Sequence, residues 1–470
     1  MDKKNIKITV LGAGISGLAT AYRLDKEGYD VKIFESRSEP GGAMQTSIEE
    51  GYLVDYGPNS GLETTPLISQ LAEELGIKDQ MVYANEEASK RYILRKGELH
   101  ALPTNPPAFL KSKLFSTTAK LRLAAEPFIG RSKDGYYQSM SQFVRRRLGQ
   151  EFLDYAIDPF VSGVFAGDPA KLSVKSAFPK LYRLEEVYGG LIKGMIRGAK
   201  ERKQRAEQSK QDAKMFSFTG GMQSFPKAIA DKLNDKINYN CKIQKVEKTG
   251  KGYRVYYRHK EENKFVDSHL LLVAIPAHAS TKIFDELDPN LSSHLNDIYY
   301  PPVMMLYLGY KKDKIGRPLD GFGYLIPSKE KRSFLGAIWS STIFQNRAPE
   351  DSASFTLFVG GARSPHLFEM EREKLIAKVV DEFNQIMDIS SQPDFVRDKL
   401  WAKAIPQYNV GYIEHENYFE EFERNNPGIF LSGNYRGGIS VGDCIKNSDL
   451  VFNKIQDSIV PVPQEELKTN

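Results

Sequence analysis

The sequence has little cysteine, little histidine and no long apolar segment. Its 470 residues include two cysteines and seven histidines. Cys241 and Cys444 lie far apart, without a CxxC pair or a neighbouring histidine, so neither a disulfide framework nor a metal site is predicted. The longest apolar runs, at 270–276 and 303–308, are too short to cross a bilayer. These absences favour a reducing compartment and a cytoplasmic location, with any membrane contact peripheral, at the inner face of the cell membrane.

The sequence also lacks the patterns of nucleophilic catalysis and of nucleic-acid binding. The histidines are scattered singly, and no Ser/His/Asp or CxH spacing occurs. The net charge is only +5, without a basic stripe interleaved with aromatic residues, so no nucleic-acid partner is expected. Because the first strand begins near Ile6, we expect no signal peptide. The length predicts two or three domains.

What the sequence does contain is a dinucleotide-binding pattern between Ile6 and Glu35. An apolar strand enters a glycine turn, a helix follows, and a second strand ends at Glu35. Glycine permits the tight turn and lets a pyrophosphate approach the N-terminus of the helix, whose free N–H groups favour negative charge. Glu35 would accept hydrogen bonds from a ribose diol and repel a 2′-phosphate. The candidate residues of the turn are Gly12, Ala13, Gly14, Ile15, Ser16 and Gly17.

Further glycine turns indicate that the dinucleotide is FAD. Two of them follow Glu35, at 36–43 and 57–60, and a flavin needs such loops around its ribityl chain and ring. A last glycine turn, between residues 433 and 443, precedes the final helix and is predicted to complete the same site. The candidate residues of these turns are Ser36, Gly41, Gly42, Ala43, Gly57, Pro58, Asn59, Ser60, Gly433, Asn434, Ile439, Ser440 and Val441.

The periodicity of apolar residues predicts an α/β protein: a Rossmann-like FAD-binding domain with a mixed-sheet substrate domain and a helical insertion. Helical spacing dominates the insertion, whose charge-rich run 200–214 is interpreted as an exposed or partly disordered helix. The expected divisions are 1–81, 216–300 (with a strand meander) and 401–460 for the FAD-binding domain, 82–215 for an insertion that contacts substrate or membrane, 301–400 for the substrate sheet, and 461–470 for a disordered tail.

Seven segments together resemble the oxygen-dependent porphyrinogen oxidases of haem biosynthesis, a family within the flavin amine oxidase superfamily. They are GAGISGL, PGG after FES, YLVDYGPNS, SGVFAGDP, TGGM, AIPQY and LSGNYRGGISVGDC. The match spans essentially the whole chain, and SGVFAGDP and GNYRGG distinguish it from related families. Ala43 departs from the superfamily, where arginine is common, and leaves one phosphate contact without its usual charge. Asn434 is what porphyrinogen oxidases themselves tend to have.

The resemblance implies a six-electron oxidation of protoporphyrinogen IX or coproporphyrinogen III to the porphyrin, with FAD as cofactor, O2 as acceptor and H2O2 as product. Hydride passes to FAD, so neither a catalytic side chain nor a metal is expected. By resemblance, Arg91 binds a propionate carboxylate, as a guanidinium can do bidentately. The same resemblance adds Gly163, Leu325 and Phe344 to the substrate site, and Val246 and Trp401 to the cofactor site.

Alternatives remain open at this point. A flavin amine oxidase or a phytoene-desaturase-like enzyme would share the superfamily, and a non-catalytic FAD- or porphyrin-binding protein is a different class. Arg91 could alternatively be an ordinary surface arginine with no role in binding. The segment 106–115 mixes apolar residues with lysines, as membrane-interface segments do, and burial inside the insertion is the competing interpretation. Beyond a porphyrinogen and O2, the candidate partners are a membrane surface, the next haem-pathway enzyme and a second copy of the chain.

Overall fold

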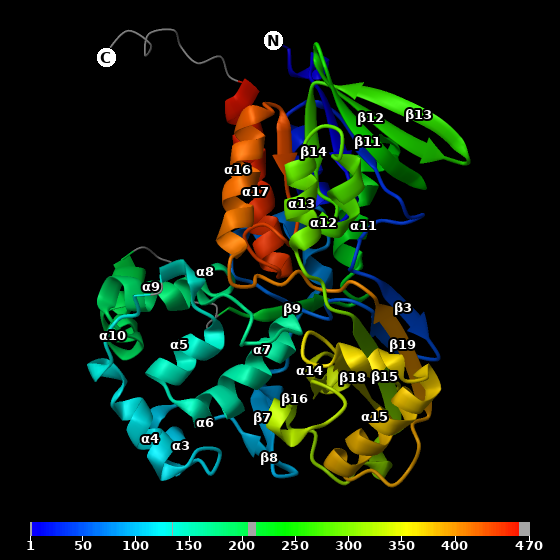
Figure 1. Cartoon of the computed structure of the whole chain (residues 1–470). Helices are drawn as coiled ribbons and strands as arrows, with labels where there is room; N and C mark the ends of the chain where they lie inside the picture. The colour runs from blue at the N-terminus through cyan, green and yellow to red at the C-terminus, as the bar shows by residue number, and fades with distance from the viewer. Residues whose placement is uncertain (1, 134, 205–212, 460–470) are drawn as a thin grey trace.

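The computed structural model describes residues 2–133, 135–204 and 213–459 (Figure 1). The parallel sheet with its helices occupies the upper part of the view, the helical insertion the lower left, and the mixed sheet the lower right. The tail 461–470 and most of the charge-rich run, at 205–212, lie outside the described residues. The α/β class and the Rossmann-like sheet agree with the prediction.

The parallel sheet brings strands from both ends of the sequence together. Its order is β10-β2-β1-β14-β20, and each neighbouring pair is parallel. The strands are β1 (Lys7–Leu11), β2 (Asp30–Phe34), β10 (Ile237–Asn238), β14 (Leu270–Val273) and β20 (Ile429–Leu431). Their apolar residues make near-continuous buried runs, as strands covered on both faces require. Because all five strands are parallel, their carboxyl ends lie at one edge.

The first and last long helices pack on each other beside this sheet. Helix α1 (Ile15–Lys26) begins at Gly14, and α17 (Val441–Ile459) ends the described chain. The Thr20 hydroxyl on α1 donates to the Ser448 carbonyl on α17, and Arg23 forms an ion pair with Asp449. Other helices of this domain are α2 (Pro66–Glu74), α11 (Ser224–Leu233), α12 (Ala277–Ser280), α13 (Pro289–Asp297) and α16 (Tyr412–Asn425).

Three small antiparallel sheets accompany the parallel one. The predicted meander is an antiparallel sheet of β11 (Cys241–Thr249), β12 (Gly252–His259) and β13 (Glu262–Ser268). A two-stranded sheet is formed by β3 (Thr46–Glu49) and β4 (Tyr52–Asp55), which leads into the turn at 57–60. A third sheet joins β5 (Gly61–Leu62), β9 (Met215–Phe218) and β6 (Met81–Tyr83).

The mixed sheet has the order β19-β15-β18-β17-β16-β7-β8. Its strands are β7 (Lys90–Arg95), β8 (Glu98–Ala101), β15 (Val303–Lys311), β16 (Gly321–Leu325), β17 (Gly336–Ile338), β18 (Ser352–Gly360) and β19 (Phe395–Trp401). The short helix α14 (Ser340–Ile343) follows β17, and α15 (Arg372–Met387) packs its apolar residues on the sheet. The hairpin β7–β8 was predicted, but β7 pairs with β16, so residues 90–101 belong to this sheet and not to the insertion as expected.

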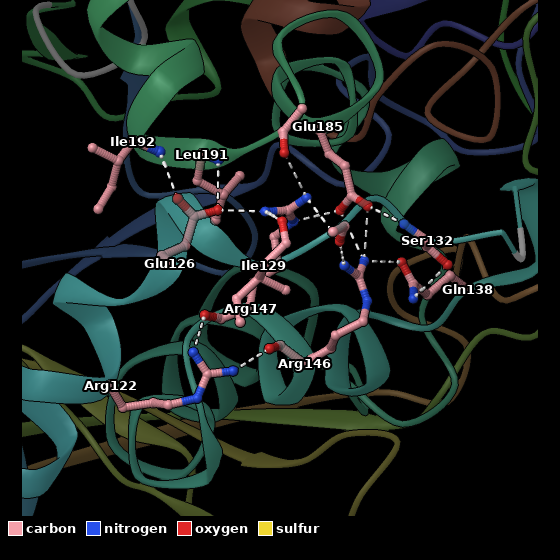
Figure 2. A network of polar contacts seen from close by, with 12 residues as sticks. Arg122, Glu126, Ile129, Ser132, Gln138, Arg146, Arg147, Glu185, Leu191 and Ile192 are labelled. Carbon is pink, nitrogen blue, oxygen red and sulfur yellow. Dashed lines mark hydrogen bonds and ion pairs between the residues drawn. The ribbon is translucent and has the colours of Figure 1, made fainter.

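The insertion itself is helical from residue 106. Its helices are α3 (Pro106–Lys111), α4 (Thr117–Ala124), α5 (Met140–Arg147), α6 (Gln150–Phe152), α7 (Asp158–Phe165), α8 (Val174–Ala177), α9 (Pro179–Tyr188) and α10 (Leu191–Gln204). A buried network of charged residues joins several of them around Arg147, which Figure 2 shows together with Glu126 and Glu185. A π-helical turn, Leu153–Ile157, runs directly into α7. Such turns are frequent at functional sites.

Candidate active site

The first glycine turn follows β1 at the carboxyl edge of the parallel sheet. The Gly12 N–H donates to the Phe34 carbonyl at 2.9 Å, and its φ of +99° favours glycine. A Cβ atom on Gly17 would lie 2.2 Å from the Gly12 carbonyl oxygen, so only glycine lets α1 come this close. The turn and the start of the helix therefore have the geometry that the glycine spacing predicted.

A cradle, the open space beside Gly14 between the first glycine turn and the turn at Gly41 and Gly42, fits a pyrophosphate. A Cβ atom on Gly14 would meet no atom within 4 Å. A Cβ atom on Gly42 would contact the Gly14 Cα atom, so the two turns lie close together. The Gly41 N–H donates to the Ala13 carbonyl at 2.8 Å, which joins the second glycine turn to the first. Open space at Gly14 beside the start of α1 is the arrangement that phosphate binding needs.

Glu35 is held at the edge of the same cradle. Its side chain is buried and accepts hydrogen bonds from the N–H groups of Ala13, at 2.8 Å, and Arg37, at 2.9 Å. The Ser36 hydroxyl donates to the same carboxylate. These bonds orient an acceptor where the ribose diol of an adenine dinucleotide would lie. The donor set and the open cradle together fit FAD.

The turn at 57–60 packs on the end of the turn at 36–43. A Cβ atom on Gly57 would lie 1.8 Å from the Ala43 carbonyl oxygen, so these backbones touch. The Trp401 Nε1–H donates to the Tyr56 carbonyl at 2.7 Å, which ties the end of β19 to this turn. Trp401 thus contacts the residue just before this turn, and the roles of Pro58, Asn59 and Ser60 stay predictions.

Asp55, just before this turn, was missed by the sequence analysis. It is buried and accepts from the Thr46 hydroxyl at 2.6 Å and from the Met222 N–H at 2.9 Å. Burial raises the pKa of its carboxyl group. The acid in YLVDYGPNS and the turn in TGGM were the available signals, but no local rule pairs two segments so far apart in sequence.

The late glycine turn reaches the same edge from the other end of the chain. The Ser432 N–H donates to the Val273 carbonyl at 2.8 Å, which aligns the end of β20 with the end of β14. The Tyr408 hydroxyl donates to the Asn434 carbonyl at 2.7 Å and accepts from the Gly438 N–H at 3.0 Å. Helix α17 then begins, after Ile439 and Ser440, at Val441. The predicted meeting of the two ends of the chain is therefore observed.

Burial favours the neutral form of two titratable groups near these turns. Burial raises the pKa of the Cys444 thiol to about 11, and burial lowers the pKa of His278, which follows β14, to about 4. Neither group is a thiolate or an imidazolium at neutral pH. The arrangement offers no activated nucleophile, which suits a reaction in which the cofactor carries the chemistry.

Two of the substrate candidates touch each other. A Cβ atom on Gly163, in α7, would lie 2.4 Å from a methyl carbon of Leu325, in β16. The neighbouring face of α7 is uncovered, since Phe160 and Val164 are 44% and 43% exposed despite their apolar side chains. These two residues were not predicted. Their helical spacing with Gly163 places all three on one face, which is open beside Leu325.

Arg91 lies on the adjacent strand. In the parallel pairing of β7 with β16, Arg91 is opposite Gly323 and Ile93 is opposite Leu325. Residues two apart in a strand face the same way, so Arg91 and Ile93 share one face. The exposed guanidinium lies 5.4 Å from the centre of the Phe322 ring and has no other side-chain partner among the described residues. It is free to bind an anion.

Phe344 lies apart from this group, next to the cofactor turns. Its side chain is buried, and it lines, together with Asn59, a small chamber of about 10 Å³. Val246 is fully buried on β11 in the core that includes Leu11 and Val273. Its proposed cofactor contact stays a prediction.

Comparisons with known proteins agree with this geometry. Residues 15–448 match the family described as flavin containing amine oxidoreductase. The chain is 33% identical to protoporphyrinogen oxidase 2 of Arabidopsis thaliana, covering 96% of the chain and 94% of that protein. It is 27% identical to coproporphyrinogen III oxidase of Bacillus subtilis (strain 168), covering 93% and 95%. A solved structure from Exiguobacterium sp. 255-15, provisionally named a protoporphyrinogen oxidase, has a TM-score of 0.78 at 21% identity, covering 96% and 99%, which supports the fold.

Proposed function

Because the chain belongs to the flavin-containing amine oxidoreductases and is an FAD-dependent oxidoreductase, we propose that it oxidises a porphyrinogen to the porphyrin in haem biosynthesis. The observation that carries the proposal is the uncovered face of α7 in contact with Leu325, with the unpaired guanidinium of Arg91 on the adjacent strand. An apolar wall and one free cation match a flat apolar macrocycle that carries carboxylates.

The reaction removes six hydrogens from the macrocycle in three equal steps. FAD, when bound, would supply two-electron oxidation with O2 as the final acceptor, so three O2 would give three H2O2 for each porphyrin. The residues of the chain bind and orient the cofactor and the substrate. Gly12, Gly14 and Glu35 would hold the dinucleotide, while Leu325 and the α7 face hold the ring plane. Protoporphyrinogen and coproporphyrinogen differ in carboxylate number, and one free arginine slightly favours the former.

Arg91→Ala is expected to raise the KM for the porphyrinogen by about 10- to 100-fold, the loss of one charge-assisted hydrogen-bonded pair. FAD content should stay unchanged, because Arg91 lies away from the glycine turns. Arg332→Ala is the control, since Arg332 is a half-buried arginine that donates only to Gln385 among the described residues. Steady-state kinetics on both variants test this, and an unchanged KM removes Arg91 from the site.

The proposed function itself is tested by fluorescence. Purified protein is supplied with protoporphyrinogen IX or coproporphyrinogen III in air, and the appearance of the fluorescent porphyrin is followed above the rate without protein. Faster formation of either porphyrin supports the proposal, and the ratio of the two kcat/KM values identifies the substrate. A primary amine oxidised in preference to both porphyrinogens would contradict it.

We also propose peripheral membrane contact through the insertion, by a set of residues that overlaps only partly with the segment 106–115. Among the described residues, no helix is long and apolar enough to cross a membrane. Leu114 and Phe115 are buried, which favours the burial interpretation for the end of the segment 106–115. Leu110, Leu121 and Phe128 are instead 67%, 66% and 89% exposed.

Replacing Leu110, Leu121 and Phe128 together by serine should therefore reduce co-sedimentation with anionic liposomes, since burial of these side chains would drive the binding. Ile48→Ser is the control, because Ile48 is 68% exposed on β3, outside the insertion. Equal sedimentation of the triple variant, the control and the wild type would rule out this surface.

A further inference from the structure

Arg347 is a buried arginine that belongs to no motif recognised in the sequence. Only 3% of the residue is exposed, and its Nη2 donates to the Ser217 hydroxyl at 2.7 Å and to the Phe218 carbonyl at 3.1 Å. Its Nη1 is buried and has no acceptor among the described residues. A buried donor that lacks a protein partner calls for a specific occupant, because leaving it unbonded is costly.

The backbone of Arg347 joins the two halves of the candidate site. Its carbonyl accepts from the Leu53 N–H at 3.3 Å and from the Tyr307 hydroxyl at 3.0 Å. Leu53 is in β4, which leads into the cofactor turn at 57–60, and Tyr307 is in β15 of the mixed sheet. One residue thus connects the strand of the cofactor turn to the substrate sheet.

The guanidinium also fixes Phe344. Its central carbon lies 5.4 Å from the centre of the Phe344 ring, within the range of a cation–π contact. Phe344 is buried and follows the short helix α14. The contact restricts the ring orientation of a residue that the family resemblance places against a pyrrole.

The chamber between these groups is small and lined by both polar and apolar side chains. Its wall includes Asp55, Asn59, Phe344 and Arg347. Because the Arg347 Nη1–H has no acceptor in the part of the chain that the structure describes, an occupant of the chamber must accept a hydrogen bond from it. Asp55 forms no ion pair with Arg347 among the described residues, so the same occupant can donate to the Asp55 carboxyl group. Water meets both requirements, and a cavity of about 10 Å³ holds about one water molecule.

We propose that Arg347 is a positioning residue: through the ring contact and a bridging water it fixes Phe344 relative to the cofactor turn at Asn59, and so sets the fit of the substrate ring. The assignment rests on the proposed function, because Phe344 is the wall that the substrate would touch. Arg347 acts on substrate only through Phe344. Substitutions at the two positions should consequently not be independent.

A double-mutant cycle tests this on the full-length protein with bound FAD. Arg347→Met and Phe344→Leu are each expected to raise the KM for the porphyrinogen about tenfold, the size of one cation–π contact. The double variant should show little more than the larger single effect, with kcat and FAD content within about twofold of wild type. Arg332→Met is the control and should leave KM unchanged. If the two single effects instead multiply, so that the KM of the double variant rises about a hundredfold, the proposal is overturned.

Arg347→Lys is the second variant. If Arg347→Met does not fold, the double-mutant cycle is measured with Arg347→Lys in its place. It keeps a cation near Phe344 but cannot reproduce both bonds to Ser217 and Phe218, so it should raise KM less than methionine does. The same cycle measured on urea unfolding reports the ring contact without substrate. If the two substitutions are coupled in the free energy of unfolding but not in KM, Arg347 does not position Phe344 for substrate. If the wild type turns over no porphyrinogen at all, the proposed function itself is overturned.

Discussion

Gly14→Val is expected to give a folded protein that retains no FAD. A Cβ atom at this position would meet no protein atom within 4 Å, and the backbone φ of −77° is accessible to any residue. The substitution therefore costs the fold little. Its methyl groups would instead occupy the space where the pyrophosphate must approach the start of α1. Affinity for FAD should fall by more than a hundredfold, as expected when several phosphate hydrogen bonds are lost together.

The measurement is the ratio of flavin to protein absorbance after gel filtration, with circular dichroism as the check on folding. Gly250→Val is the matched control, because a Cβ atom there also meets nothing within 4 Å and the residue lies in the turn between β11 and β12. The control should stay yellow. A yellow Gly14→Val preparation would show that the cradle does not hold the pyrophosphate.

The second large effect is expected at Arg147, in the centre of the insertion. Its side chain is fully buried and donates to Glu126 through Nη1 and to Glu185 through Nε, both at 2.6 Å. Glu126 in turn accepts from the N–H groups of Leu191 and Ile192, where α10 begins (Figure 2). Arg147 thus neutralises two buried carboxylates that hold α5, α9 and α10 together.

Arg147→Met should destabilise the insertion by about 3–5 kcal/mol, because it leaves Glu126 buried without a cation and removes one of the two arginines that pair with Glu185. Hydrogen exchange should speed up in α9 and α10, while FAD content stays constant because the glycine turns are remote. Arg145→Met, two residues away on the same helix, is the control: Arg145 is exposed and donates only to Gln150 among the described residues. Equal unfolding free energies for the two variants would contradict this role.

The pH dependence of unfolding gives a second readout of the network. Burial alone would raise the pKa of Glu185, but hydrogen bonds from Arg147, Arg146 and Ser132 outweigh it and hold the pKa below its usual range. A lowered carboxylate pKa contributes stability above the ordinary value of about 4.3 and loses it as the pH falls through the lowered pKa. Arg147→Met should weaken this acid dependence.

The parts that the sequence predicted well are those in which function depends on a short local pattern. The turn at Gly12–Gly17, the acid at Glu35 and the late turn after Gly433 were each recognisable because glycine spacing and a following helix are encoded within a few residues. Their convergence followed from the rule that ligands bind at the carboxyl ends of parallel strands. The hairpin at 90–101 was also recognised, but its partner strand β16 lies more than 200 residues away in the sequence.

The parts that could not be predicted depend on long-range pairing. Arg347 looks like an ordinary loop arginine until β4, β9 and β15 are placed around it. Phe115 reads as an exposed aromatic between lysines, yet it stacks on Phe152 and is buried. Burial of an individual side chain in a short irregular segment depends on which distant element covers it, and apolar periodicity carries no information on that.

The most direct test of the central claim is an anaerobic reaction of the purified FAD-loaded protein with a porphyrinogen. The account predicts that the absorbance of oxidised flavin disappears on mixing, and that admitted O2 restores it and yields three H2O2 for each porphyrin formed. Flavin absorbance that stays unchanged with both protoporphyrinogen IX and coproporphyrinogen III would contradict it.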